Sequence, residues 1–273
     1  MNVIIGAGKF SHTHLRVLNE LNIKDVTLAK SSVWSAEQKQ QFVTTHKNIS
    51  FLFNNQPCTK DTVLHIVTPS NTHANIIKKY ADAKLIFVEK PSIIYNSKID
   101  FEIANAVTNQ VYQNDWLSQI QNYRINKAKP KSIYFKYDVK NKEETDHITE
   151  IWSHVLNFIS IWFEPNCKIH IKHLEFNKEK SSIKVILDNI TELSIEASNG
   201  LVEKSVWDIC IDNEVFNNTL LGGSLLINTF NNMLSETLPL TNWYKSSWMI
   251  HRFRLINCYE IFNNDFLNYY KNK

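Results

Sequence analysis

Two glycines near the N-terminus stand where a protein backbone can hold phosphate groups. Gly6 and Gly8 follow the apolar run at residues 3–5 and precede a segment whose apolar residues have helical spacing. Gly6 permits a tight turn, Gly8 allows the backbone to approach a pyrophosphate, and the free N–H groups at the start of a helix bind its oxygens. Ser11 stands where such patterns have a third glycine and is small enough for helix and strand to pack closely. The stretch predicts a dinucleotide-binding turn, with an ordinary strand-to-helix turn as the alternative.

One cation and two hydroxyls follow the second apolar run, about twenty residues beyond the glycines. An NAD site has an acidic residue there, which accepts a hydrogen bond from the ribose 2′-OH. This chain has Lys30, Ser31 and Ser32 instead. A 2′-phosphate carries nearly two negative charges, and such a trio can bind it with charge-assisted hydrogen bonds. The sequence therefore favours NADP; NAD remains possible, and a solvated turn is the alternative.

The elements that position these residues are strands alternating with helices. Apolar runs predict strands at residues 25–29, 49–53, 62–67, 85–88 and 110–114, in addition to the first. Helical spacing predicts helices at residues 36–45 and 98–108 and around residues 73–80. Such alternation is typical of a doubly wound parallel sheet, in which ligands bind at the carboxyl ends of the strands. Gly6, Lys30, Thr68 and Lys90 all stand at such ends.

Three motifs in this order resemble a known family. GAGKFSHTH at residues 6–14, TPSNTH at 68–73 and FVEKP at 87–91 are similar to motifs of the glucose–fructose oxidoreductase, inositol dehydrogenase and rhizopine catabolism (Gfo/Idh/MocA) family of NAD(P)-dependent oxidoreductases. The resemblance implies that Thr68 and Pro69 lie beside the cofactor and that Lys90 reaches the substrate near the nicotinamide. His14 and His73 also match family histidines, and we interpret both as helix-capping or packing residues.

The candidate cofactor-binding residues combine the glycine turn, the segment after the second strand and the matched motif positions. They are Gly6, Gly8, Lys9, Phe10, Ser11, Lys30, Ser31, Ser32, Thr68, Pro69, Ser70, His73, Glu89, Lys90 and Asn114. Asn114 fits a place where the family often has an Asn-Arg pair, although Asp115 and Trp116 follow it here.

The second half of the chain is predicted to hold the substrate. The resemblance implies a helix reading acid-x-x-x-His-x-x-Asp, and here Glu150, His154 and Asn157 lie at i, i+4 and i+7, on one helical face. Asn157 replaces the usual aspartate, and an amide cannot take a proton as a carboxylate does. His154 is thus the expected acid or base, with a partly buried packing residue as the alternative. The candidate catalytic residues are Lys90, His154, Asn157 and Glu150.

Strands predominate in this second half. Apolar alternation predicts strands at residues 131–137, 169–176, 182–187, 192–197 and 202–211, with helices at 220–234 and 243–262. The predicted fold is α/β: a Rossmann domain with a doubly wound parallel sheet at residues 1–118, then an α+β domain with a mainly antiparallel sheet at residues 119–273. His170 and His173 look like a ligand pair, but their odd spacing sends them to opposite faces of a strand, so we expect no metal.

Composition narrows the function classes. The 273 residues include 30 basic and 27 acidic ones, a net charge of +3, without a Lys/Arg block that would indicate nucleic acid or an anionic membrane. We see no signal peptide and no apolar run of membrane-spanning length. The four cysteines, Cys58, Cys167, Cys210 and Cys258, are scattered and indicate free thiols in a reducing cytoplasm.

The sequence thus predicts a cytoplasmic, NADP-preferring oxidoreductase. It would transfer hydride between nicotinamide and a hydroxyl or carbonyl carbon of a sugar, nucleotide sugar or polyol-like substrate, with Lys90 polarising the substrate oxygen and His154 exchanging the proton. Homo-oligomers through the second-domain sheet are expected. The alternatives are a non-catalytic NADP-binding regulator, a reductase of an imine or keto intermediate, and an unrelated amino- or hydroxy-acid dehydrogenase, which would need an arginine for the substrate carboxylate.

Overall fold

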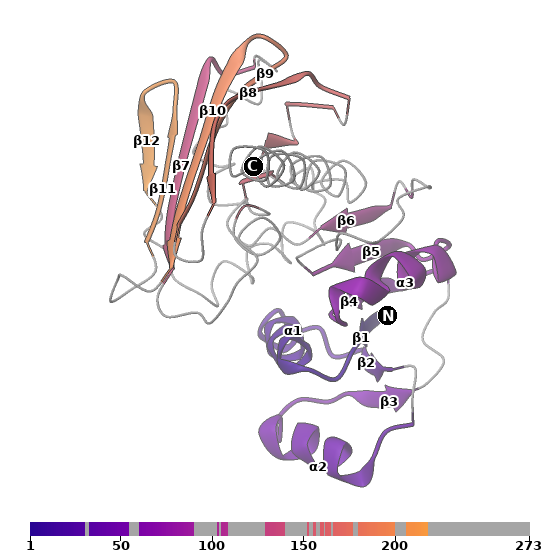
Figure 1. Cartoon of the computed structure of the whole chain (residues 1–273). Coiled ribbons are helices and arrows are strands. Elements are labelled where there is room, and N and C mark those ends of the chain that lie inside the picture. The colour runs from indigo at the N-terminus through magenta and orange to yellow at the C-terminus, as the bar shows by residue number, and fades with distance from the viewer. Residues whose placement is uncertain are drawn as a thin grey trace, which may run out of the picture. The chain divides into compact units, whose positions relative to one another are not determined.

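The structure is a computed structural model that describes residues 1–30, 33–54, 60–89, 103, 105–108, 129–139, 152, 155–156, 159–160, 162–164, 166–176, 180–199 and 206–217. These residues belong to two compact units, one holding those up to residue 108 and the other those from 129 to 217 (Figure 1). The predicted domain boundary between residues 118 and 119 lies outside the described residues and stays a prediction.

The first unit is built on a six-stranded parallel sheet. Its strands are β1 (Asn2–Ile5), β2 (Val26–Ala29), β3 (Leu52–Asn54), β4 (Val63–Ile66), β5 (Leu85–Val88) and β6 (Ala106–Thr108). They lie in the order β3-β2-β1-β4-β5-β6, and every pair is parallel. The strand order reverses direction between β1 and β4, which is the switch point at which doubly wound sheets bind ligands. The Rossmann prediction is confirmed.

Helices cover both faces of this sheet because alternate strand residues point to opposite sides. Ile4 of β1 packs in one apolar cluster with Leu15 and Leu18 of α1 (Lys9–Glu20) and Phe42 of α2 (Ala36–Thr45). Its neighbours Val3 and Ile5 pack on the other side with residues of α3 (His73–Lys79), which follows the short 3-10 helix η1 (Ser70–Thr72). The switch point between β1 and β4 therefore lies between two helical layers.

The end of the parallel sheet differs from its prediction. Residues 98–108 were expected to form a helix, but Ala106–Thr108 form β6, in parallel register with Ile86–Val88. Ala106 and Val107 are buried there, so pairing with β5 outweighs the helical spacing. The strand expected at residues 110–114 lies outside the part of the chain that the structure describes.

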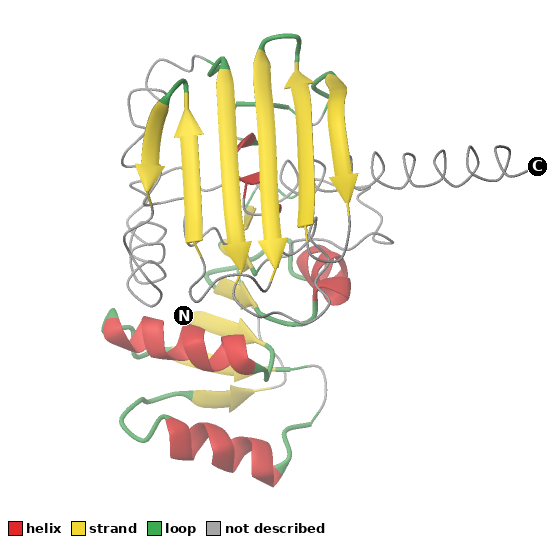
Figure 2. Ribbon diagram, turned by 60° about the vertical axis from the view of Figure 1, so that its left-hand side comes forward, coloured by secondary structure: helices red, strands yellow, loops and turns green. Residues whose placement is uncertain are grey.

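The second unit contains a six-stranded mixed sheet, seen face-on in Figure 2. Its strands are β7 (Ser132–Val139), β8 (Ile169–Phe176), β9 (Lys180–Leu187), β10 (Thr191–Asn199), β11 (Val206–Ile211) and β12 (Glu214–Asn217), in the order β12-β11-β7-β10-β9-β8. The pair β7 and β10 is parallel and the other four pairs are antiparallel. The mainly antiparallel second sheet is confirmed, with β12 as an additional strand.

One strand of this sheet breaks the regular alternation. In β8, Ile171 lies opposite Val185 and His173 opposite Lys184, so Lys172 is an extra residue in a β-bulge. His170 lies opposite Ile186, two residues from Lys184 on β9. His170 and His173 are therefore on the same face of the sheet, and the prediction that sent them to opposite faces is wrong.

Among the described residues, no helix is long and apolar enough to cross a membrane.

Candidate functional site

A cavity of about 880 Å³ opens in the first unit at the carboxyl ends of β1, β2 and β4. It is lined by the glycine turn after β1, by Lys30 after β2, by Thr68 and Pro69 after β4, and by one side of α3. Small-molecule and cofactor sites have volumes of roughly 300–1,000 Å³. The structure thus brings the predicted glycine, lysine and Thr-Pro segments together around one cavity of suitable size.

Gly6 occupies a backbone conformation that other residues rarely adopt. Its φ is 140°, and its N–H donates to the carbonyl of Ala29 at 2.9 Å, which ties the turn to β2. A Cβ at this position would lie 2.9 Å from Cγ2 of Val67 and 3.0 Å from the Val67 carbonyl oxygen. Both the positive φ and the close approach of Val67, which directly follows β4, require glycine here.

Gly8 is suited to an anion for a different reason. It is the N-cap residue of α1, where no side chain caps the helix and no acidic residue stands in the first turn. A Cβ on Gly8 would have no described atom within 4 Å, so its backbone borders open space in the cavity. Uncapped N–H groups and the positive end of a helix dipole bind phosphate oxygens. The residues present therefore fit the pyrophosphate of a dinucleotide.

The next three residues of the turn divide between cavity and core. Lys9 and Phe10 line the cavity, and Phe10 is 48% exposed. Ser11 is fully buried, its N–H donates to the Gly8 carbonyl at 3.0 Å, and its hydroxyl has no hydrogen-bond partner among the described residues. Ser11 thus packs α1 against the sheet, as its small size predicts.

Lys30 also lines the cavity, and α2 positions it. Its Nζ donates to Oε1 of Gln38 at 2.5 Å and lies 5.1 Å from the centroid of the Trp34 ring. Gln38 is itself fixed by a capping box with Ser35, the N-cap residue of α2. The lysine therefore has a defined direction at the end of β2. Ser31 and Ser32, its predicted partners, lie outside the described residues.

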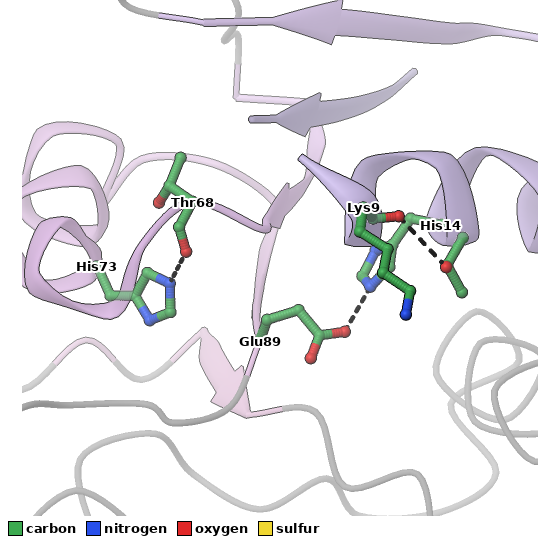
Figure 3. A network of polar contacts seen from close by, with 6 residues as sticks. Lys9, His14, Thr68, His73 and Glu89 are labelled. Atoms are coloured by element: carbon green, nitrogen blue, oxygen red, sulfur yellow. Dashed lines mark hydrogen bonds and ion pairs between the residues drawn. The ribbon is translucent and has the colours of Figure 1, made fainter. Parts of the chain in front are cut away.

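The loop after β4 is held by residues of η1 and α3. The hydroxyl of Thr72 lies 2.7 Å from both the Thr68 hydroxyl and the Pro69 carbonyl oxygen. Nε2 of His73 donates to the Thr68 carbonyl at 2.8 Å (Figure 3). His73 is 1% exposed and packs behind the loop, while Ser70 is half-buried at the start of η1. Thr68 and Pro69 line the cavity, and His73 positions them.

Glu89, predicted to meet the cofactor or Lys90, has a different described partner. Its Oε1 accepts from Nε2 of His14 at 2.6 Å, and both side chains are buried (Figure 3). The Glu89 N–H donates to the Ile66 carbonyl at 2.9 Å. The His14–Glu89 contact joins α1 to the segment that follows β5, on the carboxyl side of the sheet.

A second buried histidine, His65, contacts His14 of this pair. The ring of His65, on β4, meets the His14 ring edge-on at a centroid distance of 5.5 Å, and its Nε2 donates to Oδ1 of Asn2 at 3.1 Å. Complete burial, and to a lesser degree the charge of His14, hold the pKa of His65 well below its usual 6.5. His65 is therefore neutral in the folded protein at neutral pH.

The sequence predictions missed the contribution of α3 and its C-cap residue to the cavity. Asn75, Ile76 and Lys79 of α3 and its C-cap residue Tyr80 line the cavity. Their spacing of one and three residues puts them on one helical face, and this was the signal available in the sequence. Lys79 raises the lysines around the cavity to three, and none of the described lining residues is acidic. This charge balance favours an anionic ligand.

Seven predicted site residues lie outside the described residues: Lys90, Asn114, Glu150, His154, Asn157, Ser31 and Ser32. Their roles stay predictions. Within the described ranges, no group of three or more His, Cys, Asp or Glu residues could hold a metal ion.

No family profile matches the sequence, and no curated protein resembles it significantly. Among solved structures, the chain is similar to a myo-inositol dehydrogenase from Corynebacterium glutamicum, with a TM-score of 0.69 and 10% identity over 91% of this chain and 92% of that one.

Two further similar structures are a UDP-N-acetylglucosamine 3-dehydrogenase from Acidithiobacillus ferrooxidans and the WlbA dehydrogenase from Thermus thermophilus, the latter in complex with NAD and α-ketoglutarate. Their TM-scores are 0.65 and 0.63, at 14% and 12% identity, over 93% and 91% of this chain and 95% and 92% of theirs. The chain therefore has the two-part fold of these dehydrogenases over nearly its full length.

Proposed function

We propose that this protein is an NAD(P)-dependent oxidoreductase of the Gfo/Idh/MocA type. The cavity at the switch point carries the proposal, because an open glycine backbone, an uncapped helix start and three lysines line it together. The chain has the fold of a myo-inositol dehydrogenase and a UDP-N-acetylglucosamine 3-dehydrogenase. We infer a substrate of the same chemical class: a sugar, a nucleotide sugar or a cyclic polyol.

NADP is the proposed cofactor. Lys30 occupies the position after β2 where an NAD site has an acidic residue that accepts from the ribose 2′-OH. Lys9 and Lys79 add two further positive charges to the same cavity. Positive charge around this cavity favours NADP over NAD, because the additional 2′-phosphate can form charge-assisted hydrogen bonds, which are stronger than neutral ones. When bound, the nicotinamide would supply the hydride acceptor or donor.

The chain's own residues would supply the rest of the chemistry. Lys90 directly follows Glu89, whose backbone and side chain are both fixed, and Pro91 biases Lys90 away from helical geometry. We assign to Lys90 the stabilisation of negative charge on the substrate oxygen and to His154 the exchange of its proton. Glu150 and Asn157 would orient His154.

We further propose that copies of the chain associate through the outward face of the second sheet. Tyr134, half-buried on this face, has a pKa raised by burial and then by Glu196, to which it hydrogen-bonds. Lys184 pairs with Glu192 at 2.8 Å on the same face. A face with an aromatic ring and both charge signs can match a second copy of itself. Light scattering of wild type and Tyr134→Asp tests this, and a monomeric wild type would exclude it.

The cytoplasm is the proposed compartment, since the scattered cysteines suit a reducing environment.

The deciding experiment separates an enzyme from a binding protein. Purified protein is titrated with NADPH and NADH by fluorescence, then incubated with sugars, nucleotide sugars and cyclic polyols and with their keto forms, while absorbance of the reduced cofactor is followed. The proposal expects cofactor binding and turnover of at least one substrate. Binding without turnover would support a regulator instead, and turnover of imines or keto acids alone would move the protein to another substrate class.

His154→Ala is the matched variant for the chemistry. Turnover should fall by roughly 10²–10⁴ while the Kd for NADPH stays the same. Wild-type turnover in this variant would return His154 to a packing role.

A further inference from the structure

The bulge in β8 creates a feature that the cofactor site does not use. β8 is the last strand in the sheet order, and β9 is the one neighbour it has among the described strands (Figure 1). Lys172 is inserted between Ile171 and His173. In a regular strand His170 and His173 would point to opposite faces of the sheet. The single extra residue places them on the same face.

Burial on the neighbouring strand identifies that side. Ile183 and Val185 of β9 are 1% and 0% exposed and face the core. The alternate residues of β9, Lys184 and Ile186, therefore face away from the core. Lys184 lies opposite His173, and Ile186 lies opposite His170. Both imidazoles are therefore on the outward face, and both residues are exposed.

The spacing suits a chelate. Lys184 and Ile186 are two residues apart, which is about 7 Å along a strand, and the two imidazoles stand opposite them. Two imidazole nitrogens at that spacing can converge on one ion with bonds of about 2.0–2.1 Å. Lys184, the cation opposite His173, is already paired with Glu192 on β10 at 2.8 Å.

We propose that His170 and His173 form a two-histidine site for a transition metal ion such as Ni²⁺, Cu²⁺ or Zn²⁺. Imidazole ligands select these ions over Mg²⁺ and Ca²⁺, which prefer oxygen. Water would fill the remaining positions, because the described residues contain no group of three ligands. The site lies on β8, at one edge of the second unit's sheet, and shares no residue with the dinucleotide cavity of the first unit.

Deletion of Lys172 is the sharpest test because it keeps both histidines. Without the extra residue, strict alternation returns and the two imidazoles go to opposite faces. Calorimetric titration of the untagged full chain with NiCl₂ should give one strongest site per wild-type chain. His173→Ala and the Lys172 deletion should each weaken it by about 100-fold, since the second ligand acts at a high effective concentration.

Each outcome decides the proposal. The proposal is overturned if the Lys172 deletion variant keeps its melting temperature and binds Ni²⁺ as tightly as wild type. It is also overturned if wild type binds Ni²⁺ no tighter than the double variant His170→Ala/His173→Ala. If the deletion variant fails to fold, the single variants His170→Gln and His173→Gln decide instead: equal binding in wild type and either variant overturns it, and parallel losses support it. Lys184→Ala is the matched control and should keep full binding.

Discussion

His14 and Glu89 are 75 residues apart in the sequence, yet Nε2 of His14 lies 2.6 Å from Oε1 of Glu89. His14 belongs to α1, whose first turn lines the cavity, and Glu89 directly follows β5. Both side chains are buried, so the contact lies where electrostatic interactions are strong and unpaired charges are costly. The pair fixes the glycine turn relative to the segment that leads into Lys90.

Loss of His14 should therefore destabilise the protein. His14→Ala removes a described partner of a buried carboxylate, and we expect the free energy of unfolding to fall by about 3 kcal/mol. Arg16→Ala on the same helix is the control: it breaks a 3.8 Å contact with Glu20 between side chains that are 54% and 42% exposed, which is worth less than about 0.5 kcal/mol. Urea denaturation measures both, and equal losses would contradict the special role of the pair.

The sequence predicted those parts of the site that depend on local patterns. Apolar runs gave the five strands β1 to β5, and the glycine spacing indicated the turn at Gly6 and Gly8 because strand, turn and helix are contiguous there. The His14–Glu89 contact could not be found this way, since it needs the parallel order of β1, β4 and β5 to bring α1 beside the end of β5.

The misses have similar causes. Lys172 carries no sequence signal that marks it as a bulge, so strict alternation misplaced the two histidines of β8. Lys79 was missed because it lies in the last turn of α3, whereas the fold pattern marks the carboxyl ends of strands as the ligand positions. Ala106–Thr108 read as helix because a short buried strand shares its apolar content with a helix end.

The two glycines of the turn should respond differently to alanine. Gly6→Ala puts a methyl group 2.9 Å from Val67 at a φ of 140°, so it should lower the melting temperature clearly. Gly8→Ala meets no atom within 4 Å at a φ of −92°, so stability should change little. NADPH affinity should still fall by about tenfold in Gly8→Ala, because the methyl group would stand between backbone N–H groups and a phosphate. Unchanged affinity in Gly8→Ala would place the pyrophosphate elsewhere.

Stability should fall on mild acidification because of His65. Its folded-state pKa lies well below 6.5, while the unfolded chain protonates it near 6.5. The unfolded state therefore binds more protons below pH 6.5, and the free energy of unfolding falls by up to about 1.4 kcal/mol per pH unit. The pKa values of His12 and His46, lowered mainly by burial, act in the same direction. His65→Gln keeps a donor for Asn2, and its free energy of unfolding should change less between pH 7.5 and 5.5 than that of wild type, as measured by urea denaturation. An identical pH dependence in both proteins would mean that other groups cause it.

Cofactor choice should depend on Lys30. Lys30→Met removes the charge but keeps most of the side-chain length, and it should weaken NADPH by about 1.5–3 kcal/mol while NADH changes little. Lys79→Met tests another cation of the cavity, and the exposed Lys84 supplies a control lysine outside the described lining. Fluorescence titrations of both cofactors measure the differences. Equal wild-type affinity for NADPH and NADH would refute the NADP preference.

The enzyme assignment depends most on Lys90. Glu89, immediately before it, is anchored through its N–H to Ile66 and through its carboxylate to His14, so the segment entering Lys90 starts from a fixed position. A preorganised cation there would stabilise the alkoxide-like charge that develops on the substrate oxygen, which would lower the barrier by about 3–4 kcal/mol.

Lys90→Met preserves most of the side-chain length and removes the charge. Turnover should fall by roughly 10²–10³, while the melting temperature and the Kd for NADPH stay near wild-type values. Lys84→Met, at an exposed position before β5, should leave turnover intact. Normal turnover in Lys90→Met would mean that the dinucleotide cavity works without this lysine and that another group polarises the substrate.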